Sequence, residues 1–436
     1  MNRALSLRTR ALTRRALAAA LLAPALLAAP PAADAQTKKQ DGFVYVGTNT
    51  QFNMIMAFRR DAGGHLYAPR VYPTGGMGVF PVTPDVLGVF DSDQNIVTDA
   101  AGKRLFAVNS GSDTIAVFDI RHDGSLAPVK GSPFPSGGRN PVSLGVSGNI
   151  LTVVNKDYDL GRPGFNALTR HPNNTSFLIT KQGKLLPIPG ATVLATPAPG
   201  TGPGVSVPTQ SLVSNGGRVV FDTDFFGLHL KSFRILPGGQ LALADSQTLP
   251  ASESPSAGNP FGLAIPLGLQ VHPKTNVLYV GFVLDQRIGV YEYNELTGRM
   301  TFLRSVVATG DALVGVCWLV TNKQGTRLYA TGNFNNTIAV LDISDARNPR
   351  LLQTVTLAQG MGNPTPNFPG NAAPFQIALD PAGKFLHVVT QLGAPGQNVN
   401  ANSVQVLKVD GNGLLHLVDA VILPTFPYRP QGVVAR

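Results

Sequence analysis

A repeated strand–turn–strand pattern constrains the fold of this chain more than any other feature of its sequence. The clearest copy begins at Phe375 with an apolar strand, turns tightly at Asp380–Gly383, and continues into a second strand that ends near Val389. A loop follows, and Ser403–Val409 then predicts a third strand before a second glycine turn at Asp410. Runs of β-branched and aromatic residues between Gly, Asp or Asn turns are typical of short antiparallel strands. One copy therefore predicts four strands joined in chain order.

The same pattern recurs along the chain. Clear copies begin at Ile96, Leu269 and Leu319, and weaker copies begin near Val142 and Ser211. Repeats of four strands that span roughly 40 to 60 residues are the signature of β-propeller blades. The sequence therefore predicts a ring of such blades.

The two ends of the repeat array predict how this ring closes. The segment from Phe43 matches the second strand of the repeat and the segment from Met54 matches the third, while the first strand of that blade is missing. Residues 430–435 resemble the first strand that begins at Pro374. Adding this segment to the opening blade removes an exposed strand edge. We therefore predict an all-β, seven-bladed propeller over residues 43–436, whose first blade is completed by the C-terminal strand.

The first 36 residues have the features of a signal peptide. Five arginines precede the apolar stretch Ala16–Leu27, and Ala33–Ala35 matches an A-x-A cleavage site. The apolar stretch is shorter than the ~20 residues that span a bilayer, which disfavours a membrane anchor. The Thr13–Arg15 segment leaves both general and twin-arginine export open. We predict a bacterial signal peptide at 1–36, a linker at 37–42, and a periplasmic or secreted protein with no transmembrane segment after cleavage.

Charge and cysteine content narrow the classes of partner. The first 36 residues hold five of the 35 basic residues and one of the 25 acidic ones, so the remainder carries a net charge of +6 rather than +10. No basic run is interleaved with aromatic residues, so we predict no nucleic-acid partner. The single cysteine, Cys317, rules out an intramolecular disulfide and lies in an apolar stretch, which predicts a buried thiol. We expect a monomer.

The Tyr45–Asn49 segment, the Asp-x-x-Gly-Lys turns and the ring closure resemble the lactonase-like propellers. That family includes bacterial 6-phosphogluconolactonases and fungal carboxymuconate-lactonising enzymes. The resemblance implies that an active site would hold an Arg and a His at the start of the fifth blade and a Glu one strand later. Here Leu267, Gly268 and about Phe282 occupy those three positions. Lactone hydrolysis needs a base for water and a cation for the substrate, and none of these residues can supply either.

The seven histidines do not predict a metal site. By the same resemblance, His272 belongs to the turn after a first strand, where we expect a structural role. The other six are scattered without metal-ligand spacing; they are His65, His122, His171, His229, His387 and His416. We predict no metal and no cofactor.

Loop lengths predict which end of the propeller binds a ligand. The turns between first and second strands and between third and fourth strands are short throughout. The long segments join a fourth strand to the next first strand (73–91, 190–208, 251–266 and 361–374) or a second strand to a third (157–175 and 391–402). In an antiparallel blade both kinds of connection emerge on the same face. Because loops on a rigid scaffold concentrate binding residues, we expect a ligand at this mouth of the channel.

Polar residues at strand ends on that face are the candidate ligand-binding side chains. They are Asn49, Asn109, Asn155, Asp157, Asp222, Asp224 and Asn333, together with Arg139 and Arg429, which precede first strands. Such groups suit a small polar or carbohydrate-like ligand, and Asp157 with Asp222 and Asp224 would form an acidic site for a cation. The alternative is that these side chains hydrogen-bond the neighbouring blades and loops.

Three hypotheses of function follow. The first is an exported, non-catalytic binding or scaffold propeller whose partner is a small polar ligand or an extracytoplasmic protein. The second is a lactone hydrolase with a rebuilt site, for which Arg139 or Arg429 would supply the cation. The third, an enzyme that depends on a metal or cofactor, has the least support because no His or Cys residues cluster.

Overall fold

A computed structural model describes residues 40–80, 89–195, 206–253, 262–308, 315–357, 373–391, 402–425 and 427–436. All of them fall within a compact unit that runs from Lys39 to Arg436. The predicted signal peptide lies outside the described residues. Within the described ranges, no helix has the length and hydropathy that crossing a membrane requires.

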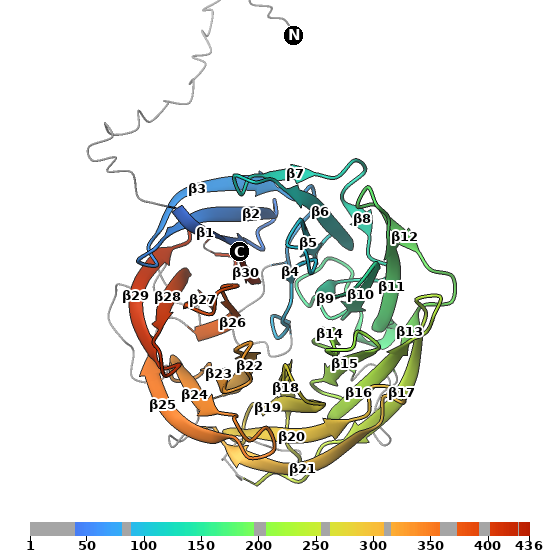
Figure 1. The fold of residues 1–436 in the computed structure, drawn as a ribbon. Helices are drawn as coiled ribbons and strands as arrows, with labels where there is room; N and C mark the ends of the chain where they lie inside the picture. The colour runs from blue at the N-terminus through green and yellow to red at the C-terminus, as the bar shows by residue number, and fades with distance from the viewer. Residues whose placement is uncertain are drawn as a thin grey trace, which may run out of the picture. The chain divides into compact units, whose positions relative to one another are not determined.

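The strands form seven antiparallel sheets arranged in a ring, as Figure 1 shows, and each sheet is one blade. We letter the strands of a blade a to d from the channel outward. Blade 1 consists of β30 (Val433–Ala435), β1 (Gln40–Gly47), β2 (Met54–Asp61) and β3 (Leu66–Pro73). Blade 2 consists of β4 (Ile96–Thr98), β5 (Arg104–Asn109), β6 (Thr114–Ile120) and β7 (Leu126–Pro128), with the short β8 (Phe134–Pro135) also paired to β6. Blade 3 consists of β9 (Pro141–Ser147), β10 (Ile150–Asn155), β11 (Asn173–Ile179) and β12 (Leu185–Pro187), with β13 (Val193–Leu194) also paired to β11.

The remaining four blades repeat the same order. Blade 4 consists of β14 (Leu212–Val213), β15 (Val219–Asp224), β16 (His229–Ile235) and β17 (Leu241–Thr248). Blade 5 consists of β18 (Pro266–Val271), β19 (Val277–Phe282), β20 (Arg287–Tyr293) and β21 (Met300–Val307). Blade 6 consists of β22 (Val316–Thr321), β23 (Arg327–Gly332), β24 (Thr337–Asp342) and β25 (Arg350–Thr356). Blade 7 consists of β26 (Ala373–Leu379), β27 (Phe385–Gln391), β28 (Ser403–Val409) and β29 (Leu415–Ile422). The predicted all-β, seven-bladed propeller is confirmed.

The apolar core lies between the blades. In blade 4 the b strand β15 is buried along its whole length, whereas in the outer strand β17 only Leu241 is buried and the other residues are partly or fully exposed. Tyrosines on b strands also bond across the blade interfaces. The hydroxyl of Tyr45 donates to the backbone oxygen of Gly124 (2.9 Å), and that of Tyr329 donates to Gly413 (3.0 Å). Apolar packing and these hydrogen bonds together fix the spacing of the blades.

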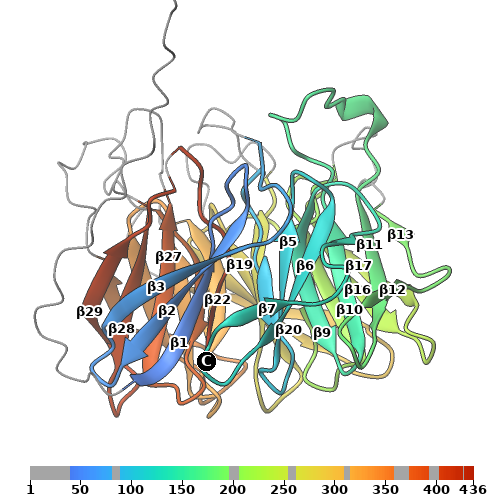
Figure 2. The ribbon, with the colours of Figure 1, turned by 90° about the horizontal axis from the view of Figure 1, so that it is seen from above.

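The two faces of the ring differ in the length of their connections. Antiparallel order places the a–b and c–d turns on one side, the turn face, and the b–c and d–a connections on the other, the loop face. The long gaps between strands are all b–c or d–a connections, as the sequence predicts. Of the six predicted segments, only 157–175 is fully described; it carries the 3-10 helix η1 (Ala167–Thr169). Figure 2 shows this segment rising on the side away from the C-terminal residue.

The C-terminal segment closes the ring as predicted. β30 pairs antiparallel with β1, with Val433 opposite Val46 and Ala435 opposite Val44. Beyond this pairing, Phe43 and Arg436 exchange two backbone hydrogen bonds of 2.7 and 2.8 Å. β1 itself begins at Gln40 and so includes the last residues of the predicted linker.

Deleting residues 430–436 should lower the free energy of unfolding by at least ~4 kcal/mol, because burial of the Val433 side chain is lost and the edge of β1 is exposed. Chemical denaturation followed by circular dichroism measures the effect. Arg436→Ala serves as a control, since it leaves the backbone pairing intact and should change stability little. A truncated protein that unfolds at the same denaturant concentration as the full chain would contradict this closure.

Candidate functional site

The innermost strands of all seven blades surround a cavity of about 340 Å3 in the central channel. Aliphatic residues are the most numerous of its lining residues, and they include Leu212, Leu319 and Ile377. Its polar lining residues are Asp93, Gln94, Thr98, Gln210 and Gln270. The cavity surface is therefore mixed, with aliphatic side chains from the a strands and several polar groups that include one carboxylate.

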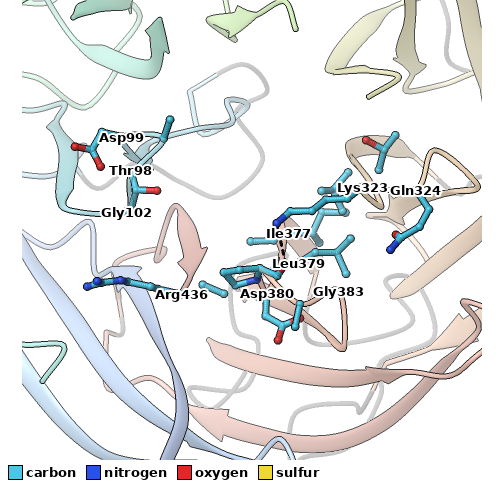
Figure 3. A pocket seen from close by; sticks show the side chains of 17 residues that line it. Thr98, Asp99, Gly102, Lys323, Gln324, Ile377, Leu379, Asp380, Gly383 and Arg436 are labelled. Atoms are coloured by element: carbon cyan, nitrogen blue, oxygen red, sulfur yellow. Dashed lines mark hydrogen bonds between the residues drawn. The ribbon is translucent and has the colours of Figure 1, made fainter. Parts of the chain in front are cut away.

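A second cavity of about 490 Å3 lies at the turn-face end of the channel. Thr98, Val320 and Ile377 line both cavities, so the two adjoin, and the a–b turns of blades 2, 6 and 7 surround the outer one. The channel therefore opens on the turn face, opposite to the predicted binding face. Figure 3 shows the charged residues at this mouth, which are Asp99, Lys323, Asp380 and Arg436.

Residues 89–95, which we call the channel segment, lead from the connection after blade 1 into β4. Side chains of blades 7 and 1 hold its backbone in place. Gln376 Nε2 donates to the backbone oxygen of Ser92, and Gln431 Nε2 donates to that of Phe90, both at 2.6 Å. The channel segment is thus bonded to blades that are far from it in the sequence.

Blades 3 and 4 hold the other end of the channel segment. The backbone N–H of Leu144 donates to the backbone oxygen of Gln94 (3.0 Å), and Gln210 Nε2 donates to Gln94 Oε1 (3.0 Å). Asn95 Nδ2 donates to the backbone oxygen of Val142 (2.7 Å). The bond from Gln210 orients the Gln94 side chain beside the cavity, and the other two hold the backbone around it.

Lys156 binds the middle of the channel segment. Its side chain is fully buried, and Nζ donates to the backbone oxygen of Asp91 at 2.5 Å. Burial lowers the pKa of Lys156 to about 7, and Arg170 adds to this effect, while Asp91 and Asp222 oppose it. Because desolvation disfavours the ammonium, a large fraction of Lys156 is neutral near pH 7.

An apolar cluster, which we call the loop-face cluster, packs at the other end of the channel. Its residues come from d–a connections, b–c turns and the first residues of a strands, all of which lie on the loop face. They are Val79, Val89, Phe90, Val207, Phe225, Leu228, Ile265, Leu267, Val283, Cys317, Trp318, Ala373 and Phe375. Each is at most 7% exposed, so the cluster separates the cavity from the loop face.

The predicted asparagines are held by hydrogen bonds within the fold. Asn49 Nδ2 donates to the backbone oxygen of Arg429 (2.9 Å), and Asn49 Oδ1 accepts from the backbone N–H of Val79 (2.8 Å). Asn109 is fully buried among Asn53, Thr74 and Thr114, all within hydrogen-bond distance.

The other two asparagines also contact neighbouring segments. Asn155 Nδ2 donates to the backbone oxygen of Ser136 and to Asn173 Oδ1 (3.1 and 3.0 Å). Asn333 Nδ2 donates to the backbone oxygen of Pro374 (3.1 Å), and its side chain keeps partial exposure. These contacts support the structural interpretation; ligand binding by the four asparagines stays a prediction.

The three predicted aspartates have separate partners. Asp224 forms a buried ion pair with Lys231 at 2.8 Å, and its other oxygen accepts from the backbone N–H of Val207 (2.7 Å). Asp222 Oδ2 accepts from Asn174 Nδ2 (3.0 Å), and burial raises its pKa to about 7.

Asp157 lies beside the segment that follows it. Its Oδ2 accepts from the backbone N–H of His171 (2.7 Å), and its Oδ1 lies 3.7 Å from Arg139 Nε. Among the described residues, no group of three His, Cys, Asp or Glu side chains could hold a metal ion. The predicted acidic site of Asp157, Asp222 and Asp224 is therefore not assembled there.

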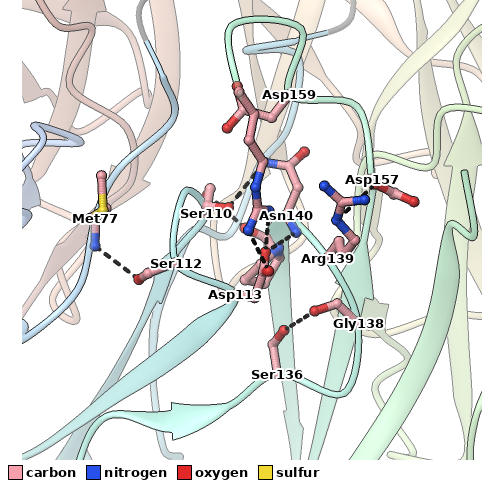
Figure 4. A network of polar contacts seen from close by, with 12 residues as sticks. Met77, Ser110, Ser112, Asp113, Ser136, Gly138, Arg139, Asn140, Asp157 and Asp159 are labelled. Atoms are coloured by element: carbon pink, nitrogen blue, oxygen red, sulfur yellow. Dashed lines mark hydrogen bonds and ion pairs between the residues drawn. The ribbon is translucent and has the colours of Figure 1, made fainter. Parts of the chain in front are cut away.

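The two predicted arginines contact different partners. Figure 4 shows Arg139 beside Asp157, and 44% of the Arg139 side chain is exposed. The guanidinium of Arg429 lies 4.6 Å from the centre of the Phe90 ring. The sequence analysis missed a neighbouring pair. Arg162 binds both carboxylate oxygens of Asp113 at 2.7 Å. The only sequence signal near this ion pair was the length of the 157–175 segment, which contains Arg162.

Comparison with known proteins gives the family. The family described as lactonase, 7-bladed beta-propeller, matches residues 206–427, just over half of the chain. The chain belongs to this lactonase family. No curated protein matches the sequence.

Solved structures share the fold of this lactonase-family propeller at low sequence identity. The periplasmic gluconolactonase of Pseudomonas aeruginosa has a TM-score of 0.65 at 17% identity, covering 90% of this chain and 98% of its own. A protein of Lactobacillus plantarum gives 0.64 at 18%, covering 91% and 99%. A candidate 6-phosphogluconolactonase of Bacteroides uniformis gives 0.63 at 16%, covering 91% and 100%.

The fifth-blade positions implied by the lactonase resemblance are buried and apolar here. Leu267 is fully buried in the loop-face cluster. A Cβ atom at Gly268 would lie 2.1 Å from the backbone oxygen of Cys317, so this position leaves no room for a side chain. Phe282 is 1% exposed in the core between blades 4 and 5. The described structure therefore offers no Arg, His or Glu at these places.

The predicted position of His272 and the predicted burial of Cys317 are confirmed in the lactonase propeller. His272 lies in the turn after β18, is 4% exposed, and its Nε2 is 3.1 Å from the backbone oxygen of Gly325. Cys317 is a buried free thiol in β22, and burial raises its pKa well above the usual value.

The free energy of unfolding should rise with pH between roughly pH 7 and 8.5 because of Lys156. In this range the unfolded chain binds a proton on Lys156 that the folded chain largely does not, which gives a slope of up to ~1.4 kcal/mol per pH unit. Lys156→Met should flatten this slope, while Lys184→Met, at an exposed lysine of the same blade, should keep it. Denaturant titrations at several pH values measure the slopes; equal slopes for all three proteins would refute a buried, neutral Lys156.

Proposed function

We propose that this lactonase-family propeller is an exported, non-catalytic binding or scaffold protein. The observation that supports this best is the burial of Leu267 at the position implied for the catalytic cation, next to a glycine whose surroundings exclude a side chain. Lactone hydrolysis requires a base that activates water and a cation that binds the substrate. Neither group is present at the implied positions.

The loop face remains the proposed binding surface for a small polar or carbohydrate-like ligand or a protein partner. Arg139 and Asn333 keep exposure there, while most other candidate side chains are bonded to the fold. Export rests on the first 36 residues, and we expect a mature chain that begins near Gln36 outside the cytoplasm. Recovery of uncleaved chain in the membrane fraction would count against export.

Purified protein should not hydrolyse 6-phosphogluconolactone or gluconolactone faster than the spontaneous reaction. Loss of one preorganised charged group typically lowers the rate by ~10²- to 10³-fold, and all three implied groups are absent together. A pH-stat assay with and without protein measures the difference.

The same assay distinguishes the alternative of a hydrolase with a rebuilt site. Turnover well above background that is abolished by Arg139→Ala or Arg429→Ala, in a variant that remains folded, would favour the hydrolase. Turnover that survives both substitutions would also contradict the non-catalytic proposal.

A further inference from the structure

The cavity in the turn-face half of the channel contains a carboxylate without a charged partner. Asp93 lines this cavity and is 8% exposed. Its Oδ1 accepts a 2.7 Å hydrogen bond from the backbone N–H of Gln94, which is the carboxylate's one hydrogen bond within the described residues. Its Oδ2 accepts no hydrogen bond from the described residues.

No charged side chain of the described structure offsets Asp93. Burial raises the pKa of Asp93 to about 7, and only the Gln94 backbone N–H opposes this. Lys156, which binds the same segment, donates to the backbone of Asp91 instead. Asp93 is also the one titratable residue among those that line the cavity. An ionised buried carboxylate is unfavourable without a cation, so a ligand cation would gain a strong partner here.

The rest of the cavity favours a small ligand with an apolar body. Gln94 Nε2 donates no hydrogen bond within the described residues, while its Oε1 is held by Gln210. The cavity is also lined by Gln270, by Thr98 and by aliphatic side chains such as Leu212 and Val433. The ligand would meet the Asp93 carboxylate and the available amide donor of Gln94, with aliphatic side chains of the a strands nearby.

We propose that this cavity binds a small primary ammonium ion with a compact aliphatic body, which enters from the turn face. The ammonium group donates hydrogen bonds to Asp93, and the aliphatic part packs against the a strands. A divalent metal ion fits poorly, since calcium takes six to eight oxygen ligands and the cavity offers a single carboxylate. The site is independent of the proposed loop-face function, because the loop-face cluster separates the two.

Calorimetric titration of the whole protein with n-butylammonium chloride at pH 8 tests the proposal. We expect a Kd of about 1 mM or tighter, which is within reach of a ligand this small. Uncharged n-butanol should bind at least about tenfold more weakly, since it lacks the charge-assisted hydrogen bond.

Asp93→Asn is the decisive variant. It keeps an oxygen for the Gln94 N–H and removes the buried charge, so it should fold and be at least as stable as the wild type at pH 8. It should weaken n-butylammonium binding by about tenfold or more. Asp123→Asn, at an exposed turn-face residue that lines neither channel cavity, should leave binding unchanged.

The pH dependence adds a second readout. Lowering the pH from 8 to 6 should weaken wild-type binding by about tenfold, because Asp93 becomes protonated, and should not affect Asp93→Asn. Absence of n-butylammonium binding at 10 mM to the wild type would overturn the proposal. Equal binding by Asp93→Asn, or equal binding of n-butanol, would overturn it as well.

Discussion

The antiparallel pairing of β30 with β1 is the contact on which the channel depends. Three residues at the end of the chain supply the a strand of the first blade, so the seventh wall of the channel is built from Val433 and its neighbours. Gln431, just before this strand, also holds the channel segment through the backbone of Phe90. The same C-terminal residues therefore close the ring and hold the channel segment in place. Without β30, the first blade would lack its a strand and the channel segment would lose its bond to Gln431.

The channel segment divides the interior into two chemically different halves. Toward the loop face, Leu267, Trp318 and Phe375 belong to one buried apolar cluster. Toward the turn face, the space stays open and carries Asp93, Gln94 and other polar groups. Apolar packing displaces water from the first half, whereas the second half keeps room for a ligand. The loop-face end of the channel, where the family resemblance places the catalytic residues, is thus closed by apolar packing. The turn-face end, which contains the Asp93 carboxylate, is open.

The fold could be predicted from the sequence because its signals are local. The Asp380 carboxylate accepts hydrogen bonds from the backbone N–H groups of Lys384 and Phe385, and the Asp99 carboxylate does the same for Lys103 and Arg104, which explains why the Asp-x-x-Gly-Lys turn is recognisable in these two blades. The closure was visible for the same reason, since the strand at Val433 resembles other first strands. Likewise, alignment of one strand of the fifth blade was enough to show that Leu267 and Gly268 occupy the positions where the family resemblance implies Arg and His.

The site was less predictable because it depends on distant contacts. Asp93 lies in a connection that does not repeat, and its burial results from bonds that Gln376, Gln431 and Gln210 make to the channel segment. No local pattern marks such a residue. Polar strand-end residues such as Asn109 look alike in the sequence whether they face a ligand or a neighbouring blade, and here many bond to the fold.

Trp318 gives a direct measurement of the central claim, that packing closes the channel toward the loop face. It is the one tryptophan of the chain and is fully buried within the loop-face cluster. Its fluorescence should therefore be blue-shifted and nearly insensitive to iodide, with quenching appearing only on unfolding. Red-shifted emission that iodide quenches readily in the folded protein would show that water reaches the cluster, and would contradict a closed channel.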